Sequence, residues 1–353
     1  MLHHAILCAL SLAPSSVPHV LLAPSAVEPA QQSSTTASAR PHSSMAELID
    51  LRCIWQDSPH NAFTDLIRFE SRFLCAFREG RGHVSTDGAI RILASDDGGD
   101  WESIAVVRQD GTDLRDANLS ITPDGRLMLV GGAAHRSEDD ARAKVGTIAS
   151  FSNDGIEWTD PVWLIEPGRW MWRVRWHSGR AYGVSYSAGD KRRFLELHHS
   201  SDGVDFDILK TPLFAEGVPS EASLELDENG RMLCVLRRDK EDNSAFFGVA
   251  SSPYTDWQFR DLGIHIGGPC LRRLPDGRLL VAGRRRGEEL AEHRTVLWEL
   301  DEAKALLTEL LVLPSGDDTS YPGMVWHQDR LWMSYYSTHE DEQSRIYFAS
   351  ISL

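Results

Sequence analysis

The chain has 353 residues, a formal net charge of −16, 42% hydrophobic residues and 25% charged residues. This composition is typical of a soluble globular protein, and without a run of 18 apolar residues we expect no membrane-spanning helix. The acidic balance argues against nucleic acid as a partner, because the surface that binds nucleic acid is basic.

Residues 1–44 are rich in Ser, Ala and Pro and show neither a strand nor a helix period. Ala5 to Ala13 has the composition of the apolar region of a secretory signal, although His3 and His4 stand where Lys or Arg is usual. The alternatives are a disordered leader and a translation start at Met45. A signal would imply a secreted or periplasmic protein, and a start at Met45 a cytoplasmic one. We therefore divide the chain into a leader or disordered segment, 1–44, and a folded domain, 45–353.

From Leu48 onward, short apolar runs alternate with Gly, Asp and Asn turns, a pattern that predicts an all-β domain. One turn recurs with the form Ser-x-Asp-Gly-x-x-aromatic. Its copies are Ser95–Trp101, Ser152–Trp158 and Ser200–Phe206, with a degenerate copy at Ser251–Trp257. Ser and Asp side chains cap backbone N–H groups in such turns, and Gly supplies a positive φ. A turn that recurs about every fifty residues indicates a radial or stacked repeat.

A second landmark recurs with the same period, namely a turn followed by Arg and an apolar residue at the start of each second strand. Its six copies begin at Arg72, Arg126, Arg180, Arg231, Arg278 and Arg330. Six units of four strands predict a six-bladed β-propeller. The run Ile49–Trp55 lies outside the first unit, so we expect it to close the ring as the outer strand of the last blade, beside Ile346–Ala349. Two β-sandwiches are the competing layout, which the even period disfavours.

The cysteines are Cys8, Cys53, Cys75, Cys234 and Cys270. The last four lie in apolar, strand-like runs without CxxC spacing, which predicts buried, unpaired thiols. The histidines, including His198, His199 and His339, lack the spacing of metal ligands. We therefore expect neither a metal nor a cofactor.

The innermost strands of a propeller line its central channel, so the starts of these strands are candidate site positions. Aligned with one another, these starts carry Asp65, Asp116, Arg173, Glu221, Pro269 and Tyr321. Charged side chains are rare at core positions. The ring is therefore interpreted as a pocket rim, and the alternative is that some of these charges pair with each other for structure.

The ends of the second strands carry a further set of polar side chains, namely Arg78, Arg237 or Arg238, Arg284 or a neighbour, and Tyr336. Guanidinium groups bind carboxylates with two hydrogen bonds, so several of them at one mouth imply an anionic ligand. Arg285 and Arg286 are interpreted as solvating the blade edge. Trp170 and Trp172 are either core residues or a platform on which a sugar stacks.

With these repeated turns, the six-unit period and this order of residues, the sequence resembles the sialidase (neuraminidase) superfamily over residues 48–353. The resemblance implies a tyrosine nucleophile at Tyr321, activated by Glu221, and an acid/base aspartate at Asp87. It further implies three arginines that hold the substrate carboxylate, of which Arg237 is one and Arg284 or Arg294 another. The family's remaining arginine opens the first inner strand, but His60–Asp65 contains none, and Arg78 or Arg173 is the expected substitute.

Three functions follow, all with a carbohydrate as the partner. The first is a retaining exo-glycosidase that removes sialic acid or a related acidic sugar, with Tyr321 and Glu221 in hydrogen-bond reach. The second is a glycosidase of the same fold for another sugar, with Asp65, Asp116 and Glu221 as its carboxylates. The third is a non-catalytic glycan-binding propeller with a shallow mouth and no paired acids.

Overall fold

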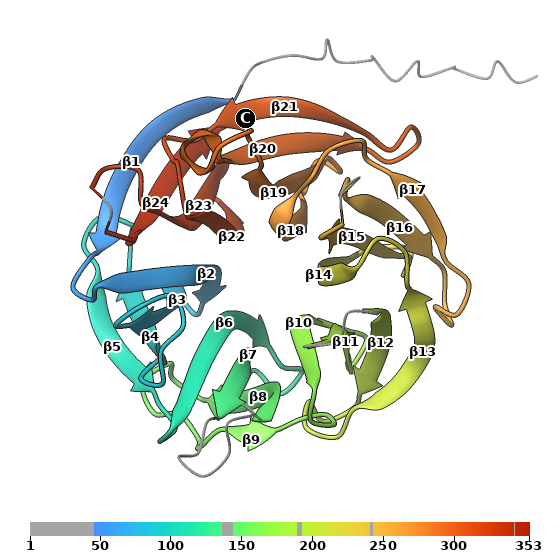
Figure 1. The fold of residues 1–353 in the computed structure, drawn as a ribbon, viewed down its shortest axis with the longest axis horizontal. Coiled ribbons are helices and arrows are strands. Elements are labelled where there is room, and N and C mark those ends of the chain that lie inside the picture. Colours follow the sequence, from blue (N-terminus) through green and yellow to red (C-terminus); the bar gives the residue numbers. More distant parts are fainter. Residues whose placement is uncertain (1–45, 136–143, 189–192, 241–242, 342) are drawn as a thin grey trace, which may run out of the picture. The chain divides into compact units, whose positions relative to one another are not determined.

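The computed structural model describes residues 46–135, 144–188, 193–240, 243–341 and 343–353. The predicted leader, and Cys8 within it, lie outside the described residues. In the described part of the chain, twenty-four strands form six sheets of four strands each, and one short 3₁₀ helix, η1 (Leu290–Glu292), interrupts them. The predicted six-bladed β-propeller is confirmed, and Figure 1 shows the blades in a ring around the central axis.

The blades follow one another along the chain, and each runs from an innermost to an outermost strand. Blade 1 is β2 (His60–Phe69), β3 (Arg72–Gly80), β4 (Ala89–Ser95) and β5 (Glu102–Val107), and blade 2 is β6 (Thr112–Ile121), β7 (Leu127–His135), β8 (Lys144–Ser152) and β9 (Val162–Trp163). Blade 3 is β10 (Arg169–His177), β11 (Arg180–Ser187), β12 (Leu195–Ser200) and β13 (Asp207–Phe214), and blade 4 is β14 (Pro219–Leu226), β15 (Met232–Arg238), β16 (Phe246–Ala250) and β17 (Gln258–Asp261). Blade 5 is β18 (Gly267–Arg273), β19 (Leu279–Arg285), β20 (Arg294–Asp301) and β21 (Leu306–Val312), and blade 6 is β22 (Thr319–His327), β23 (Arg330–Ser337) and β24 (Arg345–Ser352), completed by β1 (Glu47–Trp55).

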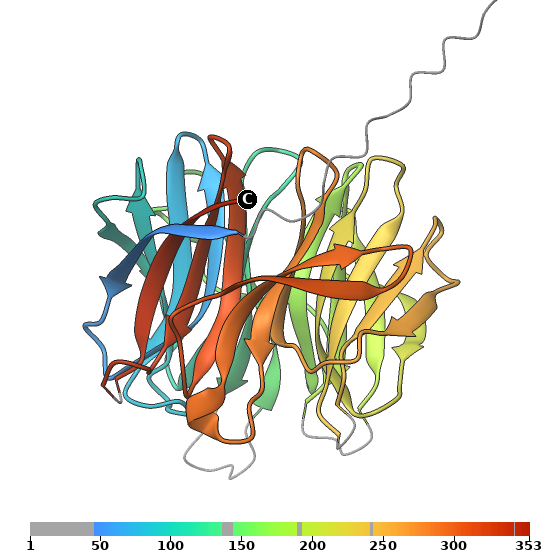
Figure 2. The ribbon, with the colours of Figure 1, turned by 90° about the horizontal axis from the view of Figure 1, so that it is seen from above.

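The ring is closed by β1, which pairs antiparallel with β24 from Glu47 opposite Ser352 to Trp55 opposite Ile346. The last blade therefore takes its outer strand from the start of the folded domain, as predicted from the run Ile49–Trp55. Figure 2 shows β1 lying along the outside of blade 6. This pairing fastens the two ends of the ring with backbone hydrogen bonds.

The recurring turns join the third strand of a blade to the fourth, as the sequence predicts. In the copies that begin at Ser95, Ser152 and Ser200, the Ser Oγ accepts a hydrogen bond from the Gly N–H three residues later, at 2.9, 2.8 and 2.9 Å. These glycines have φ values of 84°, 78° and 80°, a region that L side chains rarely adopt. The local chemistry of each turn thus fixes the outer edge of its blade.

The hydrophobic core lies between neighbouring blades. Leu74 and Ile92 of blade 1, for example, pack in one cluster with Leu129 and Ile148 of blade 2. Cys75, Cys234 and Cys270 are buried and unpaired, as expected, and burial raises the pKa values of the Cys75 and Cys234 thiols. The expectation for Cys53 is wrong, because it is unpaired but exposed on the outer strand β1.

No helix within the described ranges is long and apolar enough to cross a membrane.

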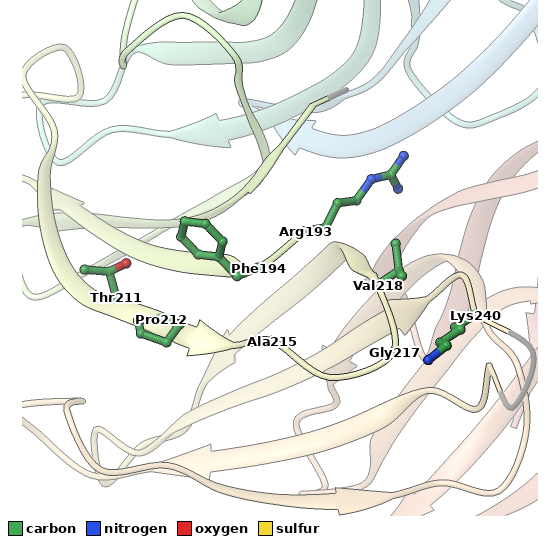
Figure 3. Close-up of a pocket in the computed structure, with 8 residues that line it drawn as sticks. All are labelled: Arg193, Phe194, Thr211, Pro212, Ala215, Gly217, Val218 and Lys240. Atoms are coloured by element: carbon green, nitrogen blue, oxygen red, sulfur yellow. The ribbon is translucent and has the colours of Figure 1, made fainter. Parts of the chain in front are cut away.

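We call the face at which the inner strands begin the mouth face. The connections from one blade to the next arrive there, and so do the ends of the second strands. Between blades 3 and 4, this face carries a pocket of about 580 Å³ (Figure 3). Because all these segments converge on one face, this is where a binding site can be assembled from residues far apart in the sequence.

A buried ion pair joins the blades beneath the mouth. Arg173 of β10 donates to Asp65 Oδ1 of β2 at 2.7 Å and to the Pro322 carbonyl of β22 at 2.8 Å. Asp65 Oδ2 also accepts the Leu119 N–H of β6 at 2.8 Å. The Arg173 and Asp65 side chains are 1% and 5% exposed. Four blades thus meet at one pair of charges.

Replacing Arg173 with Met leaves the Asp65 carboxylate buried without its cation. We expect the free energy of unfolding to fall by about 3–5 kcal/mol, the usual cost of breaking a buried ion pair from one side. The matched control is Arg52→Met, which breaks an exposed pair with Asp50 and should cost about 1 kcal/mol or less. Urea unfolding of both variants measures the difference, and equal losses would contradict a structural role for the buried pair.

Candidate active site

Every inner strand carries a β-bulge close to its start. The register with the second strand shifts between Ala62 and Asp65, Arg115 and Asn118, Met171 and Val174, Pro219 and Ala222, Gly267 and Cys270, and Ser320 and Gly323. In each case two inner-strand residues lie opposite one residue of the second strand. Because bulges change the direction in which side chains point and are common beside active sites, these six are the natural frame for the mouth.

The bulges also define which residues are structurally equivalent. The first bulged residues are Phe63, Asp116, Trp172, Ser220, Gly268 and Tyr321, and the second are Thr64, Ala117, Arg173, Glu221, Pro269 and Pro322. The single ring predicted from the aligned strand starts is therefore wrong in phase. It mixes first positions (Asp116, Tyr321), second positions (Arg173, Glu221, Pro269) and Asp65, which follows its bulge. The alignment fails because each bulge adds one residue, and the sequence does not mark where.

Asp116 and Tyr321 share an uncommon backbone conformation, with φ values of 53° and 52°. Residues other than Gly adopt a positive φ at a cost of order 1–3 kcal/mol, and such residues concentrate at functional sites. The bulges of blades 2 and 6 thus hold these two polar side chains in the same strained conformation at the mouth.

The centre of the site is a hydrogen bond from the Tyr321 hydroxyl to Glu221 Oε1, at 2.6 Å. Both side chains are buried, and they come from blades 6 and 4, on β22 and β14, with blade 5 between them. Glu221 also accepts hydrogen bonds from Arg237 Nη1 at 2.8 Å and from the Gly268 N–H at 2.8 Å. Burial and the Glu221 carboxylate raise the pKa of Tyr321 well above its usual value, against the opposing charges of Arg237 and Arg284. The phenol is therefore neutral and aimed at a carboxylate.

Three guanidinium groups converge beside this pair. Arg237 contacts Glu221 and donates to Asp239 Oδ1 at 2.8 Å. Arg286 Nη2 lies 3.9 Å from Asp239 Oδ1, the same oxygen that accepts from Arg237. Burial and the positive charges of Arg237 and Arg284 lower the pKa of Arg286. Like charges held together in this way make the cluster a candidate site for an anion.

The third member, Arg286, was missed by the sequence interpretation, which assigned it with Arg285 to the blade edge. The interpretation holds for Arg285, which contacts Glu309 on the neighbouring outer strand. It fails for Arg286 because side chains alternate along an extended chain, so Arg284 and Arg286 share one side and Arg285 takes the other. Alternation along the run Arg284–Arg286 was the signal that could have found it.

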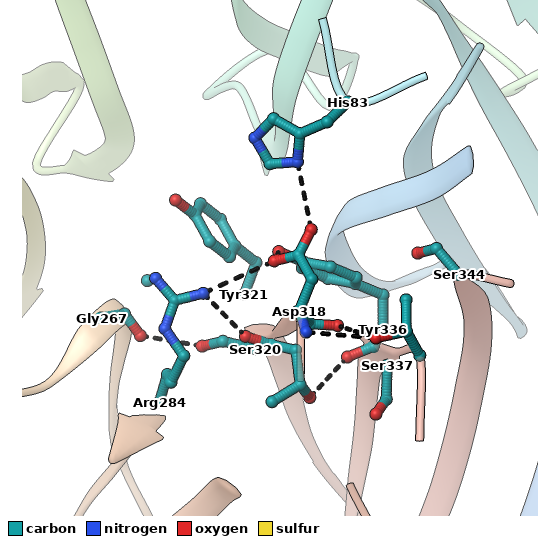
Figure 4. Close-up of polar contacts among 12 residues, drawn as sticks. His83, Gly267, Arg284, Asp318, Ser320, Tyr321, Tyr336, Ser337 and Ser344 are labelled. Atoms are coloured by element: carbon teal, nitrogen blue, oxygen red, sulfur yellow. Dashed lines mark hydrogen bonds and ion pairs between the residues drawn. The ribbon is translucent and has the colours of Figure 1, made fainter. Parts of the chain in front are cut away.

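A carboxylate on blade 6, Asp318, organises the opposite side of the site (Figure 4). It accepts hydrogen bonds from the Tyr336 hydroxyl at 2.7 Å and from His83 Nδ1 at 3.1 Å, and Arg284 lies 3.6 Å away. Although burial alone would raise the pKa of Asp318, its hydrogen bonds with His60, His83 and Tyr336 hold it well below the usual range. Asp318 therefore stays ionised and ties the loop that carries His83 to Arg284.

His60, His83 and Asp318 form the one group within the described residues whose ligand atoms lie close enough, within 4.8 Å of one another, to hold a metal ion. Two permanent cations oppose such an ion. Arg78 Nη1 lies 3.4 Å from His60 Nδ1, and Arg284 lies 3.6 Å from Asp318. We interpret the group as an ion-pair network, and the absence of a metal stays a prediction.

Arg78 is fully buried, so it is not exposed at the mouth as a ligand-binding arginine. It donates to Asp113 Oδ1 at 2.8 Å, to the Gly82 carbonyl at 2.9 Å and to Ser85 Oγ at 3.0 Å. It thereby anchors the loop 81–88 between β3 and β4. Asp87 lies in this loop and accepts from Arg81 Nε at 3.1 Å. Although burial acts in the other direction, hydrogen bonds from Ser85 and the backbone lower the pKa of Asp87.

The remaining predicted residues lie either in the mouth or beneath it, in the part of the channel that we call the floor. Asp65 and Arg173 pair with each other in the buried floor, which was the structural alternative of the sequence interpretation. Trp172 is 1% exposed and packs against Tyr321 with ring centroids 5.2 Å apart, and Trp170 is buried over Gly132. The two tryptophans are therefore core residues, and the stacking platform is not formed.

Asp116 remains in the mouth. Burial, reinforced by the Glu221 carboxylate, raises its pKa to about 7, and Arg115 opposes this rise. Its charge also acts on Tyr321 and Tyr186. Asp116 is thus a carboxyl group that can hold or release a proton near neutral pH.

The raised pKa of Asp116 predicts a pH dependence of stability. The unfolded carboxyl ionises near pH 4, so the folded protein holds an extra proton between about pH 4 and 7. The stability that this extra proton contributes is fully present below pH 4 and is lost as the pH rises through about 7. Relative to Asp116→Asn, the wild type should lose about 2 kcal/mol of unfolding free energy between pH 5 and pH 8, measured by urea unfolding. A difference that does not change with pH would contradict the shift.

No family model matches the sequence, and a search of curated proteins finds no match. Solved structures do match. A protein of unknown function from Dyadobacter fermentans has a TM-score of 0.76 and 19% identity, over 88% of this chain and 100% of that one. A Trypanosoma rangeli sialidase in complex with 2,3-difluorosialic acid, described as a covalent intermediate, has a TM-score of 0.64 and 13% identity, over 84% of this chain and 54% of that one.

An α-L-arabinanase from Penicillium chrysogenum, complexed with arabinobiose, has a TM-score of 0.64 and 15% identity, over 88% of this chain and 98% of that one. The chain spans about half the length of the Trypanosoma rangeli sialidase, with 54% of it covered. At identities of 13–19%, these likenesses concern the fold alone. The chain has the six-bladed propeller fold found in sialidases and in this arabinanase.

Proposed function

We propose that the protein is a retaining exo-glycosidase that hydrolyses a terminal acidic sugar of the sialic acid type. The observation that carries the proposal is the 2.6 Å hydrogen bond from the Tyr321 hydroxyl to Glu221, next to the cluster of Arg237, Arg284 and Arg286. A nucleophile paired with its base, beside an anion receptor, is the arrangement that this reaction needs.

In the proposed first step, the arginine cluster binds the carboxylate of the sugar and orients its anomeric carbon toward Tyr321. The Tyr321 oxygen attacks this carbon as Glu221 takes the phenol proton, and the bond to the leaving-group oxygen breaks. A neutral phenol suits an anionic substrate, because a carboxylate nucleophile would be repelled by the substrate carboxylate. Glu221 is placed to act as the base because its Oε1 already accepts the phenol hydrogen bond.

An acid residue must give a proton to the leaving-group oxygen. The same residue then acts as a base and takes a proton from the water that releases the sugar from Tyr321. The family resemblance assigns this role to Asp87, on the loop that Arg78 and His83 tie to the mouth. Asp116 is the second candidate, and its pKa of about 7 supports it. Asp87 requires its hydrogen bond to Arg81 to break before it can donate a proton.

The alternative sugar class has weaker support. A glycosidase acting through Asp65, Asp116 and Glu221 loses one of its three carboxylates, because Asp65 is buried against Arg173. A binding propeller requires no paired nucleophile and base, yet Tyr321 and Glu221 are buried against each other. Activity against a panel of acidic and neutral glycosides separates these functions.

Tyr321→Phe removes the nucleophilic oxygen and leaves the bonds of Glu221 to Arg237 and Gly268 in place. Turnover of a fluorogenic sialoside should fall to background, and Glu221→Gln should lower kcat by about 10²–10⁴-fold. The matched control, Tyr254→Phe, removes a hydroxyl bonded to the Gly230 carbonyl in blade 4 and should keep wild-type turnover. Equal rates for the wild type and Tyr321→Phe would refute the proposal.

Neighbouring arginines test the anion receptor. Arg286→Ala removes a member of the cluster and should lower kcat/KM for an anionic glycoside by about 10- to 100-fold, the value of a hydrogen bond between charged groups. Arg285→Ala, one residue away and paired with Glu309, should change it less than about twofold. Steady-state kinetics measure kcat/KM for both variants. If Arg286→Ala keeps the wild-type kcat/KM, Arg286 is not part of the receptor.

A further inference from the structure

The pocket between blades 3 and 4 lies on the mouth face but is distinct from the Tyr321 site. It has a volume of about 580 Å³, in the range of small-molecule sites. Its lining comes from the two residues before β12, the end of β13, the connection from β13 to β14 and the second residue after β15 (Figure 3). The eight lining residues are Arg193, Phe194, Thr211, Pro212, Ala215, Gly217, Val218 and Lys240.

The lining combines apolar side chains with basic ones. Phe194, Pro212, Ala215 and Val218 make it largely apolar, whereas its charged members are Arg193 and Lys240, with no acidic residue among the eight. Arg193 is paired with Asp239 at 3.0 Å, whereas Lys240 has no ion pair among the described residues. In a chain with a net charge of −16, a lysine without a carboxylate partner beside an apolar wall favours an anionic ligand. The apolar surface suits the C–H faces of a sugar ring.

Backbone hydrogen bonds hold one wall of the pocket in place. The Asp239 N–H donates to the Val218 carbonyl at 3.1 Å, and the Lys240 N–H donates to the Gly217 carbonyl at 3.2 Å. Val218 has a φ of 56°, a conformation that a β-branched residue adopts only under strain. Strain held in place by surrounding hydrogen bonds is typical of ligand sites.

The wall is continuous with the Tyr321 site through one carboxylate. Asp239 Oδ2 accepts from Arg193 of the pocket at 3.0 Å, and its Oδ1 accepts from Arg237 at 2.8 Å. Arg237 in turn contacts Glu221. Two side chains, Asp239 and Arg237, thus link the pocket to Glu221.

We propose that this pocket is a second subsite, which binds the sugar next to the one held at Tyr321 and selects an acidic neighbour. Arg193 and Lys240 bind its carboxylate, and Phe194, Pro212 and Val218 contact its apolar face. The inference rests on the proposed function, because the Tyr321 site must hold the first sugar. The substrate class that follows is an oligosaccharide of linked acidic sugars.

The test compares a short and an extended substrate, a fluorogenic aryl sialoside and α-2,8-linked disialic acid. Ala215 is exposed, so Ala215→Trp fills the pocket without disturbing the core, and Lys240→Glu reverses its charge. Both changes should lower kcat/KM for the disaccharide by about tenfold or more and that for the aryl sialoside by less than twofold. The matched control, Lys304→Glu, lies on blade 5 at 71% exposure and should leave both values unchanged.

Equal effects on the two substrates, or no effect on either, would overturn the subsite. If the wild type cleaves neither substrate, the proposed function fails, and the pocket is then tested by binding alone. Isothermal titration of disialic acid should give a Kd that Ala215→Trp and Lys240→Glu weaken by about tenfold and Lys304→Glu does not. A Kd unchanged by the first two variants, or no binding to the wild type, overturns the inference.

Discussion

The buried pair of Asp65 and Arg173 is the constraint on which the rest of the molecule depends. Two charges without water must stay paired, so the inner strands of blades 1, 2, 3 and 6 are held at one point beneath the mouth. Trp172 and Tyr321 pack together directly beside this pair, with ring centroids 5.2 Å apart. The position of the Tyr321 phenol is therefore set by the floor of the channel.

Above this floor, charge is distributed unevenly around the mouth. Blades 4 and 5 supply Arg237, Arg284 and Arg286, and blades 2 and 6 supply Asp116 and Asp318. The Tyr321 phenol stays neutral between them because burial and Glu221 outweigh the arginines. Under the proposed function, an anionic sugar would be attracted to the arginine side and would meet an uncharged phenol, so an acidic protein could bind an acidic substrate at a local basic site.

The sequence could predict those features that repeat or that are chemically local. The turns at Ser95, Ser152 and Ser200 indicated the repeat, and the six turns followed by Arg and an apolar residue indicated six blades. The apolar run at Ile49–Trp55 indicated the closing strand β1. The sequence could not predict the phase of the inner ring, because a bulge adds one residue and a shift of one residue turns a side chain to the other face. Nor could it separate Arg173, buried as a structural ion, from Glu221 at the same bulge position. The difference depends on partners from other blades, Asp65 for Arg173 and Tyr321 for Glu221.

The proposed mechanism rests on a covalent bond between the Tyr321 hydroxyl oxygen and the sugar. Trapping that bond tests the mechanism most directly. The protein would be incubated with 2,3-difluorosialic acid, the compound bound in the similar Trypanosoma rangeli structure, and then digested and analysed by peptide mass spectrometry. The account predicts one added sugar on the peptide that contains Tyr321, and none in the Tyr321→Phe variant. An adduct on Glu221 or Asp116, or an adduct that persists in Tyr321→Phe, would contradict it.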